Sequence, residues 1–258
     1  MKKTENEKTG TVSESTLLGG RVTLLQPRQG FRAGIDTVLL AAAVPAKPGD
    51  KVLDVGCGVG SAGLCVALRN KNIHLTGLDI QRKIVDLALQ NATLNGVAER
   101  CRFFCGNLLT ESAVEDNAFN IVMMNPPYQE AGTHVPSPRR NKAVSHGEEA
   151  SGASLRDWAK YAHRKLKQGG TLVMIHRADR LDDIIITLEE RRWFGSLVIH
   201  PLWPRKGVPA KRVIILAKKE RYKPIRLSSG LILHKKDGKY TPETKKILRD
   251  GKPLSVAS

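Results

Sequence analysis

The chain has 258 residues and a formal net charge of +17 at pH 7, with 41% hydrophobic and 26% charged residues. This length and composition are ordinary for a soluble globular protein with one α/β core, alone or with a small appendage. No apolar run approaches the roughly 20 residues of a membrane-spanning helix, and the polar residues after Lys3 do not form a secretion signal, so we expect a cytoplasmic protein.

In the first half of the chain, a polar tail and a short helix precede alternating strands and helices. Residues 1–16 are polar and charged, which predicts a disordered tail. A short strand is expected over Val22–Leu25, and Asp36 or Thr37 is expected to cap a helix over residues 38–43. Strands and helices then alternate: strands over Lys51–Val55, Ile73–Leu78, Cys101–Cys105 and Phe119–Met124, and helices from Gly60 to about Asn70 and over Arg82–Leu94.

The second half continues this alternation. We expect a helix over Leu155–Leu166 ended by Gly169-Gly170, a strand over Thr171–Ile175, a helix over Asp182–Arg191, and late strands over Leu197–Ile199 and Arg212–Ala217. The pattern predicts an α/β fold with a mostly parallel sheet that binds ligands at the carboxyl ends of its strands.

We divide the chain into a tail (1–16), a main domain (17–217) and a basic extension (218–258). In the extension, Lys235–Lys239 is typical of a hairpin, and Thr241 is expected to cap a helix that has Pro242 at its first position.

A glycine-rich turn follows the strand Lys51–Val55. It starts with Asp54 and contains Gly56, Gly58 and Gly60, which allow a sharp turn and close approach of a ligand to the backbone. Asp79 ends the next strand, 19 residues after Gly60, where an acid accepts hydrogen bonds from ribose hydroxyls. A glycine-rich loop alone is often a mere turn, but the strand, loop, helix, strand and acid together predict a nucleoside site.

Asn125-Pro126-Pro127-Tyr128 follows the apolar strand Phe119–Met124 directly. The two prolines cannot extend a ladder of hydrogen bonds, so backbone carbonyls and the Asn125 amide are left free at the edge of the sheet. Together with an aromatic ring they suit a flat group that carries an NH₂, either an amino-nucleobase or a side-chain amide. The alternative is a strand that ends in a proline turn.

The turn with Asp54 and its three glycines, Asp79 and the Asn125–Tyr128 motif resemble the motifs of class I S-adenosylmethionine-dependent amino-methyltransferases. The nearest resemblance is to the tRNA1(Val) adenine-37 N6-methyltransferase family, over residues 30–217 and more loosely the tail. It implies a Rossmann-like fold with a seven-stranded sheet and helices on both faces. It also implies S-adenosylmethionine as cofactor and N6 methylation of an RNA adenine, for which an anticodon loop offers exposed bases.

The resemblance also assigns roles to residues. Gly30–Thr37 is similar to a segment that closes over the methionine end of the cofactor, and Asn107 stands where relatives often have an aspartate against the cofactor's adenine. The expected catalytic residues are Asn125, Pro126 and Tyr128. The expected cofactor-binding residues are Arg32, Thr37, Asp54, Gly56, Gly58, Asp79, Ile80, Asn107, Leu108 and Asn125. A surface position for Arg32 is the alternative to a contact with the cofactor carboxylate.

The positive charge is concentrated in the second half of the chain. Residues 51–130 contain seven Lys and Arg against eight Asp and Glu, whereas residues 131–258 contain 28 against 12, a net +16. A field of one sign predicts a polyanionic partner, and we favour RNA, particularly tRNA, over a membrane surface or a general solubility bias.

Other features are less specific. The loop 129–154 contains His146 and is rich in Gly, Pro, Ser and charged residues. We expect it to form a lid that covers the reaction site, and the alternative is a flexible insertion. Cys57, Cys65, Cys101 and Cys105 match no zinc pattern and are expected as buried thiols, so no metal is expected.

Three other functions compete with this hypothesis. A glutamine N5-methyltransferase acting on a release factor would use the same motif, but relatives of that kind have a longer N-terminal domain. Methylation of another nucleic-acid amino group is a second alternative. A non-catalytic RNA-binding protein is a third, although it would not need to keep the acid, the glycines and Asn125 together.

Overall fold

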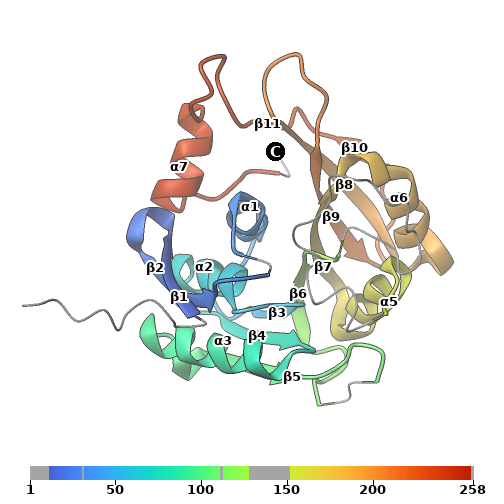
Figure 1. Cartoon of the computed structure of the whole chain (residues 1–258). Helices are drawn as coiled ribbons and strands as arrows, with labels where there is room; N and C mark the ends of the chain where they lie inside the picture. The colour runs from blue at the N-terminus through green and yellow to red at the C-terminus, as the bar shows by residue number, and fades with distance from the viewer. Residues whose placement is uncertain (1–11, 31, 111–112, 128–151, 257–258) are drawn as a thin grey trace, which may run out of the picture.

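A mostly parallel sheet runs through the computed structural model, which describes residues 12–30, 32–110, 113–127 and 152–256 (Figure 1). The strand order is β10-β8-β9-β7-β6-β3-β4-β5, and β11 also pairs with β8. Seven of these strands correspond to those expected from the sequence, and β9 runs antiparallel to both of its neighbours, β7 and β8. The strands are β3 (Lys51–Val55), β4 (His74–Asp79), β5 (Cys101–Cys105), β6 (Phe119–Met124), β7 (Leu166–Arg177), β8 (Phe194–Trp203), β9 (Arg212–Lys219), β10 (Arg226–Leu227) and β11 (Leu231–Ile232).

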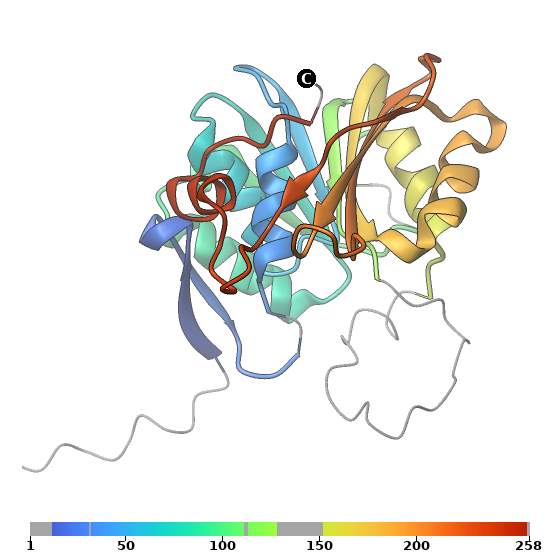
Figure 2. The same ribbon diagram turned by 90° about the horizontal axis from the view of Figure 1, so that it is seen from above.

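Helices cover both faces of the sheet (Figures 1 and 2). One apolar core lies under α1, α2 and α3, and a second lies under α5 and α6. Neighbouring residues of a strand face opposite cores, as Val122 and Met123 of β6 do. Within the described ranges, no helix has the length and apolarity to cross a bilayer. The helices are α1 (Ile35–Ala43), α2 (Ser61–Arg69), α3 (Arg82–Leu94), α5 (Leu155–Lys165), α6 (Leu181–Glu189) and α7 (Pro242–Asp250).

The segment before α1 is a hairpin, so the expected disordered tail is wrong for residues 12–16. Strand β1 (Val12–Leu17) pairs antiparallel with β2 (Val22–Pro27). The buried Asn91 of α3 fixes β2, because its side chain accepts from the Leu25 N–H at 2.7 Å and donates to the Leu25 carbonyl at 3.0 Å. This long-range amide contact stabilises a hairpin whose first strand is polar.

Two boundaries differ from the sequence expectation for identifiable reasons. Helix α1 begins after Gly34 without a side-chain cap, and both expected caps lie inside it: Thr37 is buried, and the side chain of Asp36 accepts from the Arg212 guanidinium of β9 at 3.0 Å. Gly169 and Gly170 lie inside β7 and do not end α5, which stops at Lys165 where Leu166 turns to an extended backbone.

The C-terminal segment closes back on the main domain. Short strands β10 and β11 add to β8, and α7 buries Ile247 against the core that contains α1. Thr241 caps α7 with Pro242 at the start, as the sequence predicts, and the Leu254 N–H donates to the Ala42 carbonyl at 2.8 Å. The basic extension therefore shares the sheet and the core of the main domain.

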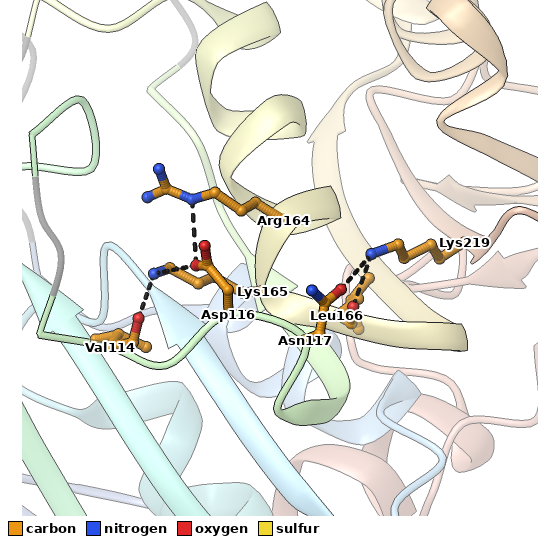
Figure 3. A network of polar contacts seen from close by, with 7 residues as sticks. All are labelled: Val114, Asp116, Asn117, Arg164, Lys165, Leu166 and Lys219. Atoms are coloured by element: carbon orange, nitrogen blue, oxygen red, sulfur yellow. Dashed lines mark hydrogen bonds and ion pairs between the residues drawn. The ribbon is translucent and has the colours of Figure 1, made fainter.

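At the amino ends of β6 and β7, a polar network closes the sheet (Figure 3). The ammonium of Lys165 is 1% exposed and donates to the Val114 carbonyl and, at 2.8 Å, to Asp116. Lys219 of β9 donates to the Asn117 side chain at 2.8 Å and to the Leu166 carbonyl at 2.9 Å. The buried cations thus have partners that tie the loop before β6 to the ends of α5 and β9.

Candidate active site

The expected site residues emerge along the carboxyl-end edge of three adjacent strands. In the register of the sheet, Val55 of β3 is paired with both Leu78 of β4 and Met124 of β6. The residues that follow these three are Gly56, Asp79 and Asn125. Since parallel strands end at the same edge, the glycine turn lies between Asp79 on one side and Asn125 on the other.

The glycine turn depends on backbone conformations and space that only glycine provides. Gly56, Gly58 and Gly60 have φ values of 69°, 54° and 81°. A Cβ on Gly56 would lie 2.5 Å from the Trp158 ring of α5, whereas a Cβ on Gly58 would meet nothing within 4 Å. The turn is therefore packed against the protein at Gly56 and open at Gly58, as a turn that approaches a ligand must be.

Asp79 faces this turn. One carboxylate oxygen accepts from the Gly58 N–H at 2.9 Å, and the other accepts from the Gln81 N–H at 3.0 Å. Burial raises the pKa of Asp79, although these backbone N–H groups act in the opposite direction. The carboxylate keeps further lone pairs for the hydroxyls of a ligand.

Asp54 lies beneath the turn and is 3% exposed. Its carboxyl accepts from the Gly63 N–H in the first turn of α2 at 3.1 Å. Burial and, to a smaller extent, nearby Asp79 raise the pKa of Asp54 to about 8, against the lowering effect of the Gly63 N–H. This contact couples the end of β3 to the start of α2, so Asp54 positions the turn between them.

At the end of β6, Asn125 is half-buried and Pro126 is buried. The expected stacking residue Tyr128 lies outside the described residues, as do His146 and nearly all of the expected lid. The structure thus places the amide and the first proline of the motif next to the glycine turn.

A turn that contains Asn107 follows β5, and the Asn107 side chain forms a hydrogen bond within it. Asn107 accepts from the Leu109 N–H at 2.9 Å, and Leu108 is buried in the core under α5. Ile80, after Asp79, is half-buried, and its carbonyl accepts from the Cys105 thiol at 3.4 Å. Cys105 is exposed, which corrects the expectation that all four thiols are buried.

Two expected cofactor residues lie on the N-terminal side. The Arg32 guanidinium donates to the Ser13 hydroxyl at 2.9 Å and to the Pro27 carbonyl at 3.3 Å, so its contacts are with the β1–β2 hairpin. Thr37 is buried in α1. No group of His, Cys, Asp and Glu that could hold a metal ion occurs in the described part of the chain.

Sequence reasoning missed Trp158, whose ring packs under Gly56. Its indole Nε1 is buried and has no hydrogen-bond partner among the described residues. An isolated tryptophan in an amphipathic helix gives no signal of such a contact, because 102 residues separate it from Gly56.

Comparison with known proteins finds methyltransferases. Residues 32–139 match the methyltransferase small domain family. A protein named tRNA1(Val) (adenine(37)-N6)-methyltransferase from Yersinia enterocolitica is 24% identical over 91% of this chain and 93% of its own length. A protein of the same name from Porphyromonas gingivalis is 26% identical over 83% of this chain and 85% of its own length.

Solved structures share the fold. A predicted O-methyltransferase from Agrobacterium tumefaciens has a TM-score of 0.69 at 24% identity, covering 85% of this chain and 98% of its own. A geranyl diphosphate C-methyltransferase from Streptomyces coelicolor, solved with S-adenosyl-L-homocysteine, has a TM-score of 0.50 at 16% identity, covering 71% of this chain and 74% of its own. The chain is thus an S-adenosylmethionine-dependent methyltransferase with a Rossmann-like fold.

Proposed function

We propose that this enzyme methylates the N6 amino group of an adenine in RNA, specifically in the anticodon loop of a tRNA. The observation that carries the proposal is the placement of Asn125 and Pro126 one strand away from the open glycine turn, at the same edge of the sheet. The names of the relatives that cover most of the chain support the same substrate.

The residues at this edge fit the cofactor. Gly58 has open space where a Cβ would stand, and Asp79 beside it offers carboxylate oxygens that can accept from two ribose hydroxyls. Gly56 and Gly58 allow the backbone to approach the amino-acid portion, and Ile80, Asn107 and Leu108 are assigned to the adenine side. When bound, S-adenosylmethionine supplies a methyl group that its sulfonium already activates.

The acceptor nitrogen needs alignment more than it needs a base. The exocyclic nitrogen of adenine shares its lone pair with the ring and is a poor nucleophile. Carbonyl oxygens of the Asn125 side chain and the Pro126 backbone accept from its two N–H groups and favour the pyramidal form that attacks. Such fixed dipoles stabilise the charge that develops on the nitrogen during transfer. Tyr128 is proposed to stack on the base.

An RNA loop matches the charge and the geometry. The net +16 of residues 131–258 favours a polyanion. An adenine inside a duplex would have to be flipped out before its N6 reached Asn125, whereas loop bases are already exposed. A tRNA substrate also agrees with the cytoplasmic location that we expect.

The test is to incubate the purified enzyme with tritiated S-adenosylmethionine and, separately, unmodified tRNA, DNA and a peptide release factor. We expect label in tRNA, recovered as N6-methyladenosine after nuclease digestion and mass spectrometry. Label found only in the release factor would replace the proposal with glutamine methylation. Label in no substrate, with RNA still bound, would support a non-catalytic RNA-binding protein.

A further inference from the structure

A hollow lies beyond the end of β8, at the same edge of the sheet as the candidate active site. It is a cavity of about 790 Å³ between the end of β8, the loop from β8 to β9, strand β11 and the start of α7. Its lining combines a tryptophan, two basic residues, one acidic residue and small or apolar residues: Trp203, Arg205, Lys206, Gly207, Val208, Pro209, Ser229, Gly230, Ile232, Thr241, Pro242 and Glu243.

The sheet register indicates the level of this cavity relative to Asn125 along the strands. Leu202 of β8 pairs with Arg212 of β9, and Arg212 pairs with Arg177 of β7. Arg177 is three residues beyond Met174, which pairs with Met124 of β6. Continuing that register for three residues puts Arg177 level with Pro127, so Leu202, and Trp203 after it, end in the same row as the Asn-Pro-Pro motif.

Three strand spacings separate β8 from β6 in the sheet order. At about 4.8 Å each they amount to roughly 14 Å. Stacked nucleotides of one strand rise about 3.4 Å each along the helix axis, so this distance corresponds to about four stacked nucleotides, and to fewer in an extended strand. Figure 2 shows the turn between β8 and β9 on the same side of the molecule as the end of β6.

The tryptophan in this cavity is held in place. Its indole Nε1 donates to the Ser229 carbonyl at 3.1 Å. Gly230 allows this approach, because its φ is +77° and a Cβ there would collide with the Pro201 carbonyl and the Trp203 indole nitrogen. Val208 and Ile232 are 38% and 37% exposed beside it. A fixed aromatic ring next to exposed apolar side chains is the usual platform for an unstacked base.

The charges around this ring suit a nucleotide. Arg205 and Lys206 are exposed in the loop between β8 and β9, and neither forms an ion pair with any residue that the structure describes. Glu243, in the first turn of α7, lines the same cavity and can accept from an exocyclic amino group. The cavity thus offers two cations for a phosphate, an aromatic ring for a base and one carboxylate acceptor, which are the contacts that a nucleotide requires.

We propose that this cavity binds an unpaired nucleotide of the RNA strand close to the target adenine, with its base on Trp203 and its phosphate at Arg205 and Lys206. The inference rests on the proposed function and extends it, because it assigns a second recognition site outside the reaction centre. Binding there would anchor the loop while the target base reaches Asn125.

The first test removes the two cations and measures tRNA methylation. We expect the Arg205→Ala/Lys206→Ala variant to raise the KM for tRNA about tenfold and to reduce the slope of log affinity against log salt by about two. Its kcat and its affinity for S-adenosylhomocysteine should stay within about twofold. The matched control is Lys47→Ala/Lys71→Ala, which removes the same charge from exposed positions near the amino ends of β3 and β4.

The second test uses a hexaadenylate ribo-oligonucleotide, a single strand without the tRNA fold, as a probe of nucleotide binding. Binding should quench tryptophan fluorescence in the wild-type enzyme, and Trp203→Phe should remove most of that change while preserving the fold. Arg205→Ala/Lys206→Ala should weaken hexaadenylate binding about tenfold.

The outcomes separate this inference from the proposed function. If the wild type methylates tRNA but the cavity variant and its control have equal KM values and salt slopes, the inference is wrong and the function stands. If the wild type does not methylate RNA, the proposed function fails, and quenching that depends on Trp203 and the two cations still supports a nucleotide site. Hexaadenylate binding that is absent, or unchanged in both variants, overturns the inference in either case.

Discussion

Buried charged side chains at the two edges of the sheet have different surroundings. At the amino-end edge, the buried Lys165 has partners in Val114 and Asp116, and Lys219 joins Asn117 to Leu166 (Figure 3). At the carboxyl-end edge, Asp54 and Asp79 are held where burial raises the pKa of each carboxyl. Burial opposes the charge at both edges, since it also lowers the pKa of Lys219, but the carboxyl groups lie next to an open turn, whereas the lysines tie chain segments together. Perturbed acids beside open space are typical of a functional site.

The largest effect is expected at the end of β6. Replacing the amide in Asn125→Ala removes the side-chain acceptor for the reacting amine, so kcat should fall by about 100-fold or more. Affinity for S-adenosylhomocysteine should stay within about tenfold. Asn120→Ala is the matched control, because Asn120 lies near the amino end of the same strand and accepts from the Lys51 N–H at 3.0 Å. Equal kcat values for both variants would remove the amino-acceptor mechanism.

The amino-end edge should show the reverse behaviour. Lys165→Met keeps an unbranched side chain but loses the bonds to Val114 and Asp116, so the free energy of unfolding should fall by about 1–3 kcal/mol. Cofactor affinity in the folded enzyme should not change. Chemical denaturation measures the loss, with Lys167→Met, an exposed neighbour, as the control. A stability equal to that of the control would mean that the network adds nothing to the fold.

A further prediction concerns the pH dependence of stability. Burial raises the pKa of Asp54 from an ordinary value of 3.8 to about 8, so the folded state keeps a proton that the unfolded state releases between these pH values. The free energy of unfolding should therefore decrease as pH rises from about 4 to 8. Asp54→Asn keeps an acceptor for the Gly63 N–H and should flatten this decrease. Asp86→Asn, exposed on α3, should leave the slope unchanged.

The parallel half of the fold is predictable because its elements are defined locally. Strands β3 and β6 and helix α3 have the expected bounds, since each apolar run ends at a glycine, a proline or an Asn-Gly pair. The start of α7 was also predictable from local sequence, because Thr241 caps the helix and Pro242 stands at its first position. The row of Gly56, Asp79 and Asn125 followed from this local information together with the rule that parallel strands end at one edge.

The remaining features depend on partners distant in sequence. Strand β1 is polar and pairs with a strand that Asn91 of α3 fixes, so its composition suggested disorder. Asp36 was expected to cap a helix, but it binds Arg212. The contact of Trp158 with Gly56 and the cavity around Trp203 arise from segments that only the folded chain brings together.

The most direct test of the account is a calorimetric titration of S-adenosylhomocysteine into the wild type, Asp79→Ala and Asp50→Ala. Asp50 precedes β3 at the amino-end edge, where it accepts from the Lys47 N–H at 2.8 Å, and serves as the matched control. We expect one site per chain in the wild type and in Asp50→Ala, and a Kd about 10–100-fold higher in Asp79→Ala. Absence of binding by the wild type, or equal Kd values for all three proteins, would contradict a cofactor site at the carboxyl-end edge.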